Sequence, residues 1–519
     1  MLNKQISAIK KVRFILFVVA FSITNSVSAQ ENKPILNYSV FASDPSSHIY
    51  HIELYCSGWI TDTINFKMPK WMPGYYQIMD YAKGVQNFSS TDKAGKKFVV
   101  KKPQDDTWQI VTKKAPFWLS YDVKADQELV ASNLLDSTHG YFIPVASIMY
   151  IEGHLNTQVT VNVVDNGRWN NMASGLNRIK GVAHQYFAPD FYQLYDSPIL
   201  IANYEELTPF VVNGIEHRFA NYSSGEFDRG LFISNLQKIV QTTANFFGEI
   251  PYMEFTFIGI HGRQGSVVHQ NNAVISFEAN DLGNPEKMKP SMCFFAQKYF
   301  QQFNGIRIRP FEFGTYSFNI ENRTNMLWVT EGLSAYYGNL IAKRAGLLTE
   351  QEILSAFGMS INRLENNPGR FNQSLIQSSY NTWNSKQNEN PGKAVFCEEK
   401  GAVVGLILDL AIRNATQNQK SLDDVMRLLY NQYYKKMNRG FTDAEFQQTC
   451  EIIAGTSLYK EFEYVNSTKE IDYNPYFTNV GLTIKMEVNP GDGNRKFTIA
   501  KIAKPTKVQQ AFLLNWIGK

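Results

Sequence analysis

The hydrophobic period of this chain changes along its length, and that change restricts the fold more than any other feature. Between about residues 35 and 205 apolar and polar side chains alternate, as in the run Tyr50, Ile52 and Leu54. Alternation of this kind predicts β-strands with one buried face. From about residue 288 apolar residues recur every three to four positions, which predicts helices. We therefore expect an α+β protein in which an antiparallel β domain precedes a helical region.

The same patterns divide the chain into segments, and roughly 150 residues per domain would allow about three domains. Within the second domain we expect strands near 208–221 and 254–260 and a helix near 231–247. The last segment alternates again and has a turn at 490–493, which predicts a short β-type tail. The expected segments are a signal peptide in 1–29, an N-terminal β domain in 30–205, a mixed and then helical domain in 206–465, and a C-terminal segment in 466–519.

Residues 1–29 have the composition of a cleavable signal peptide. Lys10, Lys11 and Arg13 precede a short apolar core in 14–21, which is too short to span a bilayer as a helix. Small residues then lead to an expected cut after Ala29. A buried N-terminal helix is the alternative interpretation. We expect a secreted or periplasmic protein without a membrane anchor once the signal is removed.

The charge and cysteine content exclude several classes of function. Four of the 51 basic residues lie in 1–29, and the 47 that remain equal the 47 acidic residues. A neutral chain has no electrostatic preference for nucleic acid or anionic lipid, so neither is an expected partner. The cysteines are widely spaced and predict no disulfide framework. All eight histidines lie at or before residue 269.

Several collinear segments together resemble one peptidase family. Residues 68–76 read MPKWMPGYY, residues 194–198 read LYDSP, and residues 327–332 read LWVTEG, with two tyrosines at 336–337. Lys400, Gly401 and the helix after them extend the match. The chain resembles family sixty-one of the metallopeptidases, the glycyl aminopeptidases. The residues that we expect to be structural in these motifs are Trp71, Pro73, Gly74, Trp328 and Gly332.

The resemblance implies an N-terminal β domain, a thermolysin-like catalytic domain with zinc, and usually a PDZ domain. A PDZ domain needs on the order of 100 residues. Too few residues follow the junction-like segment at 481–484 for a complete one. We therefore expect a C-terminal tail without a complete PDZ domain.

The zinc motif of the family, H-E-x-x-H, is altered in this sequence. Asn304 and Pro310 fix the register of the resemblance. It assigns Gln297 and Gln301 to the two histidine positions and Lys298 to the general-base position. Glutamine amides are poor zinc ligands, and a protonated lysine cannot accept a proton. Only the third ligand position, Glu331, is retained, so we expect neither zinc nor an intact catalytic residue.

Two further family sites are altered. In the segment that holds the substrate amine in the family, Val268 replaces the glutamate and His269 is kept. Cys397 and Glu398 stand where the family has two tyrosines, one of which is a candidate to stabilise the tetrahedral intermediate. We expect the substrate-binding positions of the former site to be His269, Val268 and Asn304.

The altered site leaves several local hypotheses open. Lys298 would occupy the zinc position and pair with Glu331, with Gln297 and Gln301 hydrogen-bonded around them; alternatively, Lys298 and Glu331 both reach solvent in an empty cleft. Cys397 is a packed thiol or a nucleophile. Trp71, Tyr75 and Tyr76 form a packed turn or contact a peptide. His48, His51 and Glu53 lie on a solvated strand face or form a metal cluster.

The sequence therefore favours an inactive peptidase homologue that binds a peptide or a protein in the former substrate cleft, and it leaves the enzyme class uncertain. One alternative is an active zinc aminopeptidase with an atypical ligand set such as Glu331, His269 and Cys397. Another is a non-catalytic assembly subunit that pairs with an active paralogue.

Overall fold

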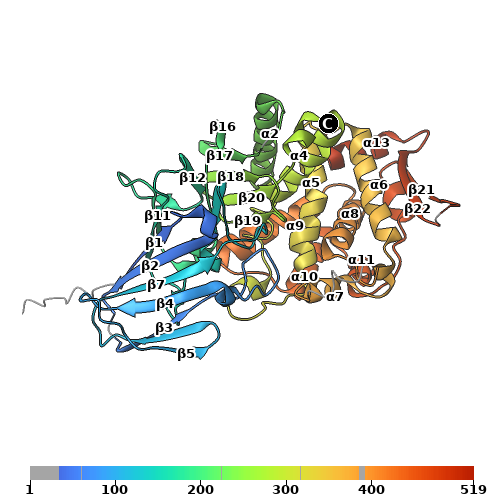
Figure 1. Ribbon diagram of the computed structural model, residues 1–519. Helices are drawn as coiled ribbons and strands as arrows, with labels where there is room; N and C mark the ends of the chain where they lie inside the picture. The colour runs from blue at the N-terminus through green and yellow to red at the C-terminus, as the bar shows by residue number, and fades with distance from the viewer. Residues whose placement is uncertain are drawn as a thin grey trace, which may run out of the picture.

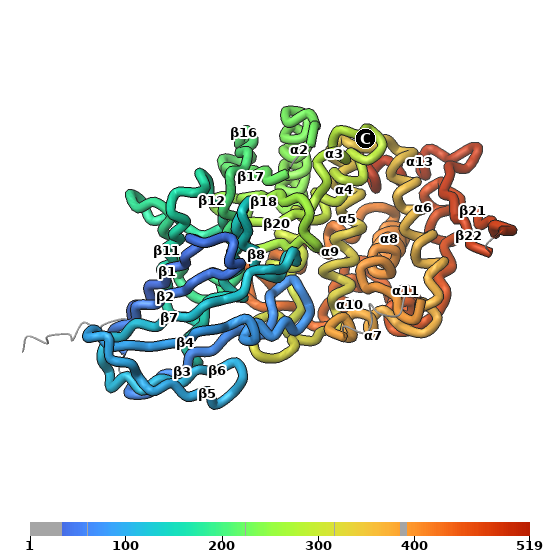
Figure 2. The backbone as a smooth tube through the Cα atoms, viewed as in Figure 1, coloured from blue at the N-terminus to red at the C-terminus, as the bar shows by residue number. Residues whose placement is uncertain are grey.

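The computed structural model describes residues 34–59, 61–223, 225–315, 317–384, 392–491 and 493–518 (Figure 1). The predicted signal peptide in 1–29 lies outside the described residues. The β-rich N-terminal part lies at one side of the molecule and the helices lie at the other, with a mixed sheet between them (Figures 1 and 2). The α+β fold class is confirmed.

The N-terminal part is built mainly on a seven-stranded sheet in the order β13-β14-β11-β1-β2-β7-β4. The predicted alternation is confirmed in β2, where Tyr50, Ile52 and Leu54 are buried. Neighbouring strands are antiparallel except β1 and β11, which pair in parallel. The strands are β1 (Ile35–Phe41), β2 (Ile49–Ser57), β4 (Val85–Thr91), β7 (Phe117–Lys124), β11 (Val159–Val164), β13 (Asn177–Arg178) and β14 (Gln185–Ala188).

Two smaller sheets complete this part, in the orders β10-β3-β6-β5 and β12-β15-β9-β8. Their inward side chains form a hydrophobic core with those of the large sheet. The bounds are β3 (Thr63–Lys67), β5 (Val100–Gln104), β6 (Thr107–Val111), β8 (Leu134–Leu135), β9 (His139–Phe142), β10 (Tyr150–Ile151), β12 (Asn171–Ser174), β15 (Ile199–Ala202) and the short helix α1 (Phe191–Tyr195).

A five-stranded mixed sheet in the order β16-β17-β18-β20-β19 joins the two halves. Its central pairs, β17 with β18 and β18 with β20, are parallel. The helix predicted near 231–247 is α2 (Arg229–Phe247), which Asp228 caps and which ends at Gly248 with φ +86°. The strands are β16 (Glu205–Val212), β17 (Ile215–Tyr222), β18 (Glu254–Ile260), β19 (Val267–Val268) and β20 (Asn272–Ser276).

The helical region follows the predicted change of period. Thr349 and Glu352 form a capping box at the start of α6, and Thr442 and Glu445 form one at the start of α10, as predicted. The helices are α3 (Ala279–Gly283), α4 (Pro285–Phe300), α5 (Leu333–Arg344), α6 (Glu350–Asn366), α7 (Leu375–Asn381), α8 (Cys397–Ala415), α9 (Leu422–Leu429), α10 (Asp443–Ala454), α11 (Tyr459–Asn466) and α12 (Asn474–Thr478). In the described residues no helix is both long and apolar enough to cross a membrane.

Two glycines set the distance between α8 and the segment before α5. Trp328–Gly332 forms a π-helical turn that continues into α5. A Cβ on Gly332 would lie 2.5 Å from the Cα of Gly401 in α8, and a Cβ on Gly401 would lie 2.8 Å from the carbonyl oxygen of Trp328. No other residue type fits this crossing, which explains why both glycines belong to the sequence motifs.

A buried ionic network holds α8 to its neighbours. The carboxylate of Asp409, which is fully buried, accepts hydrogen bonds from Arg413 Nε at 3.0 Å and from the Tyr336 hydroxyl at 2.6 Å. The backbone N–H of Leu422 donates to the same carboxylate at 2.9 Å, which ties the start of α9 to α8. Every charged atom here has a partner, as a buried charge requires.

The C-terminal segment packs on the helical region. The β-type pattern predicted for this segment forms an antiparallel pair of strands, β21 (Leu482–Val488) and β22 (Arg495–Lys501), which lies beside α6 (Figure 1). The tail also contains a helix that the alternating pattern did not predict, α13 (Lys507–Ile517). Trp516 in α13 stacks on Phe357 and donates a hydrogen bond to Tyr336.

Asp409→Ala is expected to lower the free energy of unfolding by about 3 kcal/mol, because it removes the carboxylate that buried Arg413 contacts at 3.0 Å and leaves it only the more distant carboxylate of Asp423, at 4.0 Å. Urea denaturation followed by circular dichroism measures this change. Asp105→Ala is the matched control, since Asp105 is exposed, and its effect should stay within about 0.5 kcal/mol. Equal effects of the two substitutions would contradict the role of the network.

Candidate functional site

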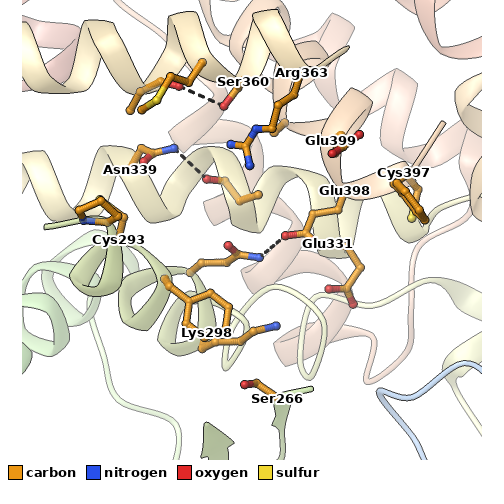
Figure 3. A pocket seen from close by; sticks show the side chains of 18 of the residues that line it. Ser266, Cys293, Lys298, Glu331, Asn339, Ser360, Arg363, Cys397, Glu398 and Glu399 are labelled. Carbon is orange, nitrogen blue, oxygen red and sulfur yellow. Dashed lines mark hydrogen bonds between the residues drawn. The ribbon is translucent and has the colours of Figure 1, made fainter. Parts of the chain in front are cut away.

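A cavity of about 1080 Å³ lies within the helical region. One face each of α4, α5 and α6 lines it, together with the first turn of α8 (Figure 3). The loop at 74–77 and α7 complete the lining. Its volume slightly exceeds the roughly 300–1,000 Å³ that small-ligand pockets occupy. The altered zinc positions therefore border a space large enough for a ligand.

The side chains at the former zinc positions form a hydrogen-bonded network at the end of α4. Gln301 Nε2 donates to Glu331 Oε2 at 2.6 Å, and Lys298 Nζ donates to Gln301 Oε1 at 3.2 Å. Gln297 Nε2 donates to Glu398 Oε1 at 2.8 Å. The two amides thus connect α4 to the turn before α5 and to α8.

The predicted pairing of Lys298 with Glu331 is wrong in its direct form. The ammonium and carboxylate of these two described residues make no direct ion pair; the Gln301 amide lies between them, accepting from one and donating to the other. Lys298 also lies 5.4 Å from the centre of the Phe294 ring. The alternative, in which both residues reach solvent in the cleft, holds in part: Lys298 and Glu331 are half-buried and line the cavity, but both oxygens of Glu331 are also hydrogen-bonded.

Tyr76 supplies a contact that the sequence did not predict. Its hydroxyl donates to Glu331 Oε1 at 3.1 Å, and its ring stacks on Phe313. Trp71, by contrast, is fully buried and donates from Nε1 to the carbonyl oxygen of Ser317. The packed-turn interpretation therefore holds for Trp71, whereas Tyr75 and Tyr76 line the cavity.

Gly74 shapes the loop that brings Tyr76 to the cavity. Its φ of +83° is a left-handed conformation that residues with a side chain rarely adopt, and a Cβ there would lie 2.7 Å from Val267. Met72 and Tyr75 bridge across this turn. The motif at 68–76 thus connects the N-terminal part to the cavity, a contact spanning 255 residues of sequence between Tyr76 and Glu331.

Burial raises the pKa of the Glu331 carboxyl, and the nearby carboxylate of Glu398 raises it further. Lys298 opposes this shift through its charge, as do Tyr76 and Gln301 through their hydrogen bonds. The pKa of Glu331 is raised overall, because the loss of water around the carboxylate outweighs these favourable interactions.

Two residues predicted to contact substrate are instead structural contacts. Asn304 is fully buried, and its Nδ2 donates to the carbonyl oxygen of Val329 and to the Ser334 hydroxyl. His269 is 1% exposed, and its Nδ1 lies 2.9 Å from Asp196 Oδ1 in the LYDSP motif. Neither side chain reaches the large cavity.

Val268, the third predicted substrate-binding position, borders a smaller cavity of about 90 Å³. Lys298, Gln301 and Glu331 line the same space. Valine presents no charge there, so it cannot hold a substrate amine as a glutamate would.

Cys397 is a packed thiol. Its side chain is 8% exposed, and burial raises its pKa to about 12. Its sulfur lies 3.8 Å from the Thr382 hydroxyl. A thiol that is protonated at neutral pH and has no histidine beside it is a weak nucleophile, which removes the alternative interpretation.

The residues at this site do not fit a zinc ion. Gln301 already donates its amide to Glu331, and Lys298 adds a positive charge where a cation would bind. Across the described residues no three His, Cys, Asp or Glu side chains are grouped to hold a metal. That finding covers both the set Glu331, His269 and Cys397 and the set His48, His51 and Glu53.

Two sequence profiles of one peptidase family match the chain. The Peptidase M61 N-terminal domain matches residues 37–203, and the M61 glycyl aminopeptidase domain matches residues 291–404. The chain belongs to the M61 glycyl aminopeptidase family. The family predicted from the motifs is therefore confirmed. No curated protein matches the chain.

Solved structures share the fold. An aminopeptidase N family protein from Idiomarina loihiensis has a TM-score of 0.84 and 23% identity, over 89% of this chain and 81% of that one. An M1 zinc metallopeptidase from Deinococcus radiodurans has a TM-score of 0.51 and 10% identity, over 85% and 95% of the two chains. Legionella pneumophila aminopeptidase A has a TM-score of 0.53 and 11% identity, over 90% of this chain and 52% of that one. At these identities the likeness shows an aminopeptidase-like fold.

Glu331→Gln is expected to change how stability depends on pH. Because the pKa of Glu331 is raised from its ordinary value of 4.5, the folded state holds this proton to higher pH than the unfolded state does. Wild-type stability therefore falls as the pH rises from 4.5 through the raised pKa, and the substitution removes that loss.

Urea denaturation at about pH 4.5 and about pH 8 tests this expectation. The free energy of unfolding of Glu331→Gln minus that of wild type should be larger at the higher pH, which means that the variant gains stability relative to wild type as the pH rises. Glu487→Gln is the matched control, because Glu487 is exposed on β21. A difference for Glu331→Gln that does not vary with pH would contradict the raised pKa.

Proposed function

We propose that this protein is an exported M61-family homologue that does not cleave peptides but binds a peptide or an extended protein segment in the former substrate cleft. A single observation carries the proposal: Gln297, Lys298 and Gln301 replace a metal centre with a hydrogen-bonded network. The signal-like segment in 1–29 supports export.

The network also opposes the chemistry of peptide hydrolysis. In the family, a glutamate activates a water for attack on the scissile carbonyl. Lys298 stands at that position, and a protonated amine cannot accept the proton that such a water must release. The two carboxylates that take part in the network, Glu331 and Glu398, both accept hydrogen bonds from glutamine amides.

The cleft itself is kept, which supports a binding role. The cavity is lined from five helices and the loop at 74–77, and its walls combine apolar with charged side chains. Pockets for small ligands combine apolar walls with a few convergent polar groups, and this cavity has both. A retained cavity of about 1080 Å³ therefore favours a ligand.

Purified protein is expected to hydrolyse glycyl and alanyl anilides no faster than a blank, with or without added zinc.

The triple substitution Gln297→His, Lys298→Glu and Gln301→His should create zinc binding, because two imidazoles and Glu331 then supply three zinc ligands. Isothermal titration calorimetry with zinc measures the binding to this variant.

The matched control is the triple substitution Gln297→Asn, Lys298→Glu and Gln301→Asn, which makes the same change of charge without adding imidazoles and should not bind zinc with comparable affinity. Wild-type turnover that zinc enhances and a chelator abolishes would contradict the proposal. Failure of the triple variant to bind zinc would contradict the assignment of these three positions.

A further inference from the structure

The face of α6 that borders the cavity ends in an arginine. Glu352, Ala356, Met359 and Arg363 recur at helical spacing and all line the space. Figure 3 shows Arg363 extending from α6 into the same cavity that Lys298 and Glu331 border. Arg363 lies near the end of α6, and the α8 residues Glu398 and Glu399 line the same cavity.

Most charged side chains around the cavity are already engaged. Lys289 pairs with Glu352, Lys298 donates to Gln301, and Glu398 accepts from Gln297. Arg363 is the exception among the cations: within the described residues its guanidinium has no hydrogen bond and no ion pair. A planar guanidinium with free donors in a cavity is suited to hold a carboxylate through two parallel hydrogen bonds.

Apolar side chains line the same cavity as this arginine. Met359, one turn before Arg363 on α6, is 52% exposed, and Phe396 at the start of α8 is 47% exposed. Both line the cavity, as does Phe294. Large apolar side chains that stay exposed inside a cavity favour an apolar ligand group beside the one that Arg363 holds.

The acids on α8 restrict the anion further. Glu398 and Glu399 line the same cavity, and they would repel a phosphate dianion more strongly than a singly charged carboxylate. They would also attract an amine. A ligand with one carboxylate, one amine and an apolar side chain would match the arginine, the acids and the apolar side chains of this cavity. A short peptide has these three groups.

We propose that the cavity binds a short peptide by its free C-terminal carboxylate, which Arg363 holds, and that the apolar side chain of the last residue rests on Met359 and Phe396. This inference rests on the proposed binding function and names the peptide end that is recognised. The cleft then binds a peptide by its C-terminus. In the family a glutamate holds the opposite end, the free amine, and Val268 replaces that glutamate here.

Isothermal titration with glycyl-leucyl-leucine and with its C-terminal amide tests the assignment. Wild-type protein should bind the free acid about tenfold more tightly or better, the loss expected for one charge-assisted pair. In Arg363→Gln that preference should disappear, and in Arg363→Lys it should remain in part. Lys460→Gln is the matched control, since Lys460 is exposed on α11 outside the cavity, and it should behave as wild type.

The outcomes separate this inference from the proposed function. Equal binding of acid and amide to wild type, or an unchanged preference in Arg363→Gln, would overturn the role of Arg363 and leave peptide binding in place. Competition by millimolar inorganic phosphate would make this a general anion site and would also overturn it. If neither peptide binds to wild type, both the inference and the peptide-binding part of the proposed function fail.

Discussion

The contact between Gly332 and Gly401 is the constraint on which the site depends. It lets the turn that carries Glu331 lie against the first turns of α8, where Cβ atoms on either residue would collide with backbone. Glu331 and Glu398 reach the same cavity for that reason. A larger side chain at either glycine would separate the helices and open the network that links them.

A half-buried carboxylate that makes no direct ion pair needs other partners, and Glu331 has them. Gln301 and Tyr76 donate to its two oxygens, and Lys298 contributes positive charge through Gln301. These donors replace what a metal ion supplies in a zinc peptidase, namely compensation for a carboxylate removed from water. The centre is therefore a satisfied polar network, and neither the family fold nor the ligand position of Glu331 implies a metal in this chain.

The change in hydrophobic period predicted the fold class and most helices, because periodicity depends on which face of an element is buried. The motif register placed Gln301 opposite Glu331, where the structure shows their hydrogen bond. Three features were beyond this reasoning. The Gln301 bridge depends on side-chain reach, the contact of Tyr76 with Glu331 depends on how two distant segments meet, and α13 forms where Trp516 can pack on Phe357.

The central claim is that this polar network stands in place of a metal centre, and the zinc content of the native protein tests it most directly. Protein purified without chelator and dialysed against zinc-containing buffer should hold far less than one zinc per chain when measured by mass spectrometry of the metal. About one zinc per chain, retained after gel filtration, would contradict the account, because tight binding needs the ligands that this site lacks.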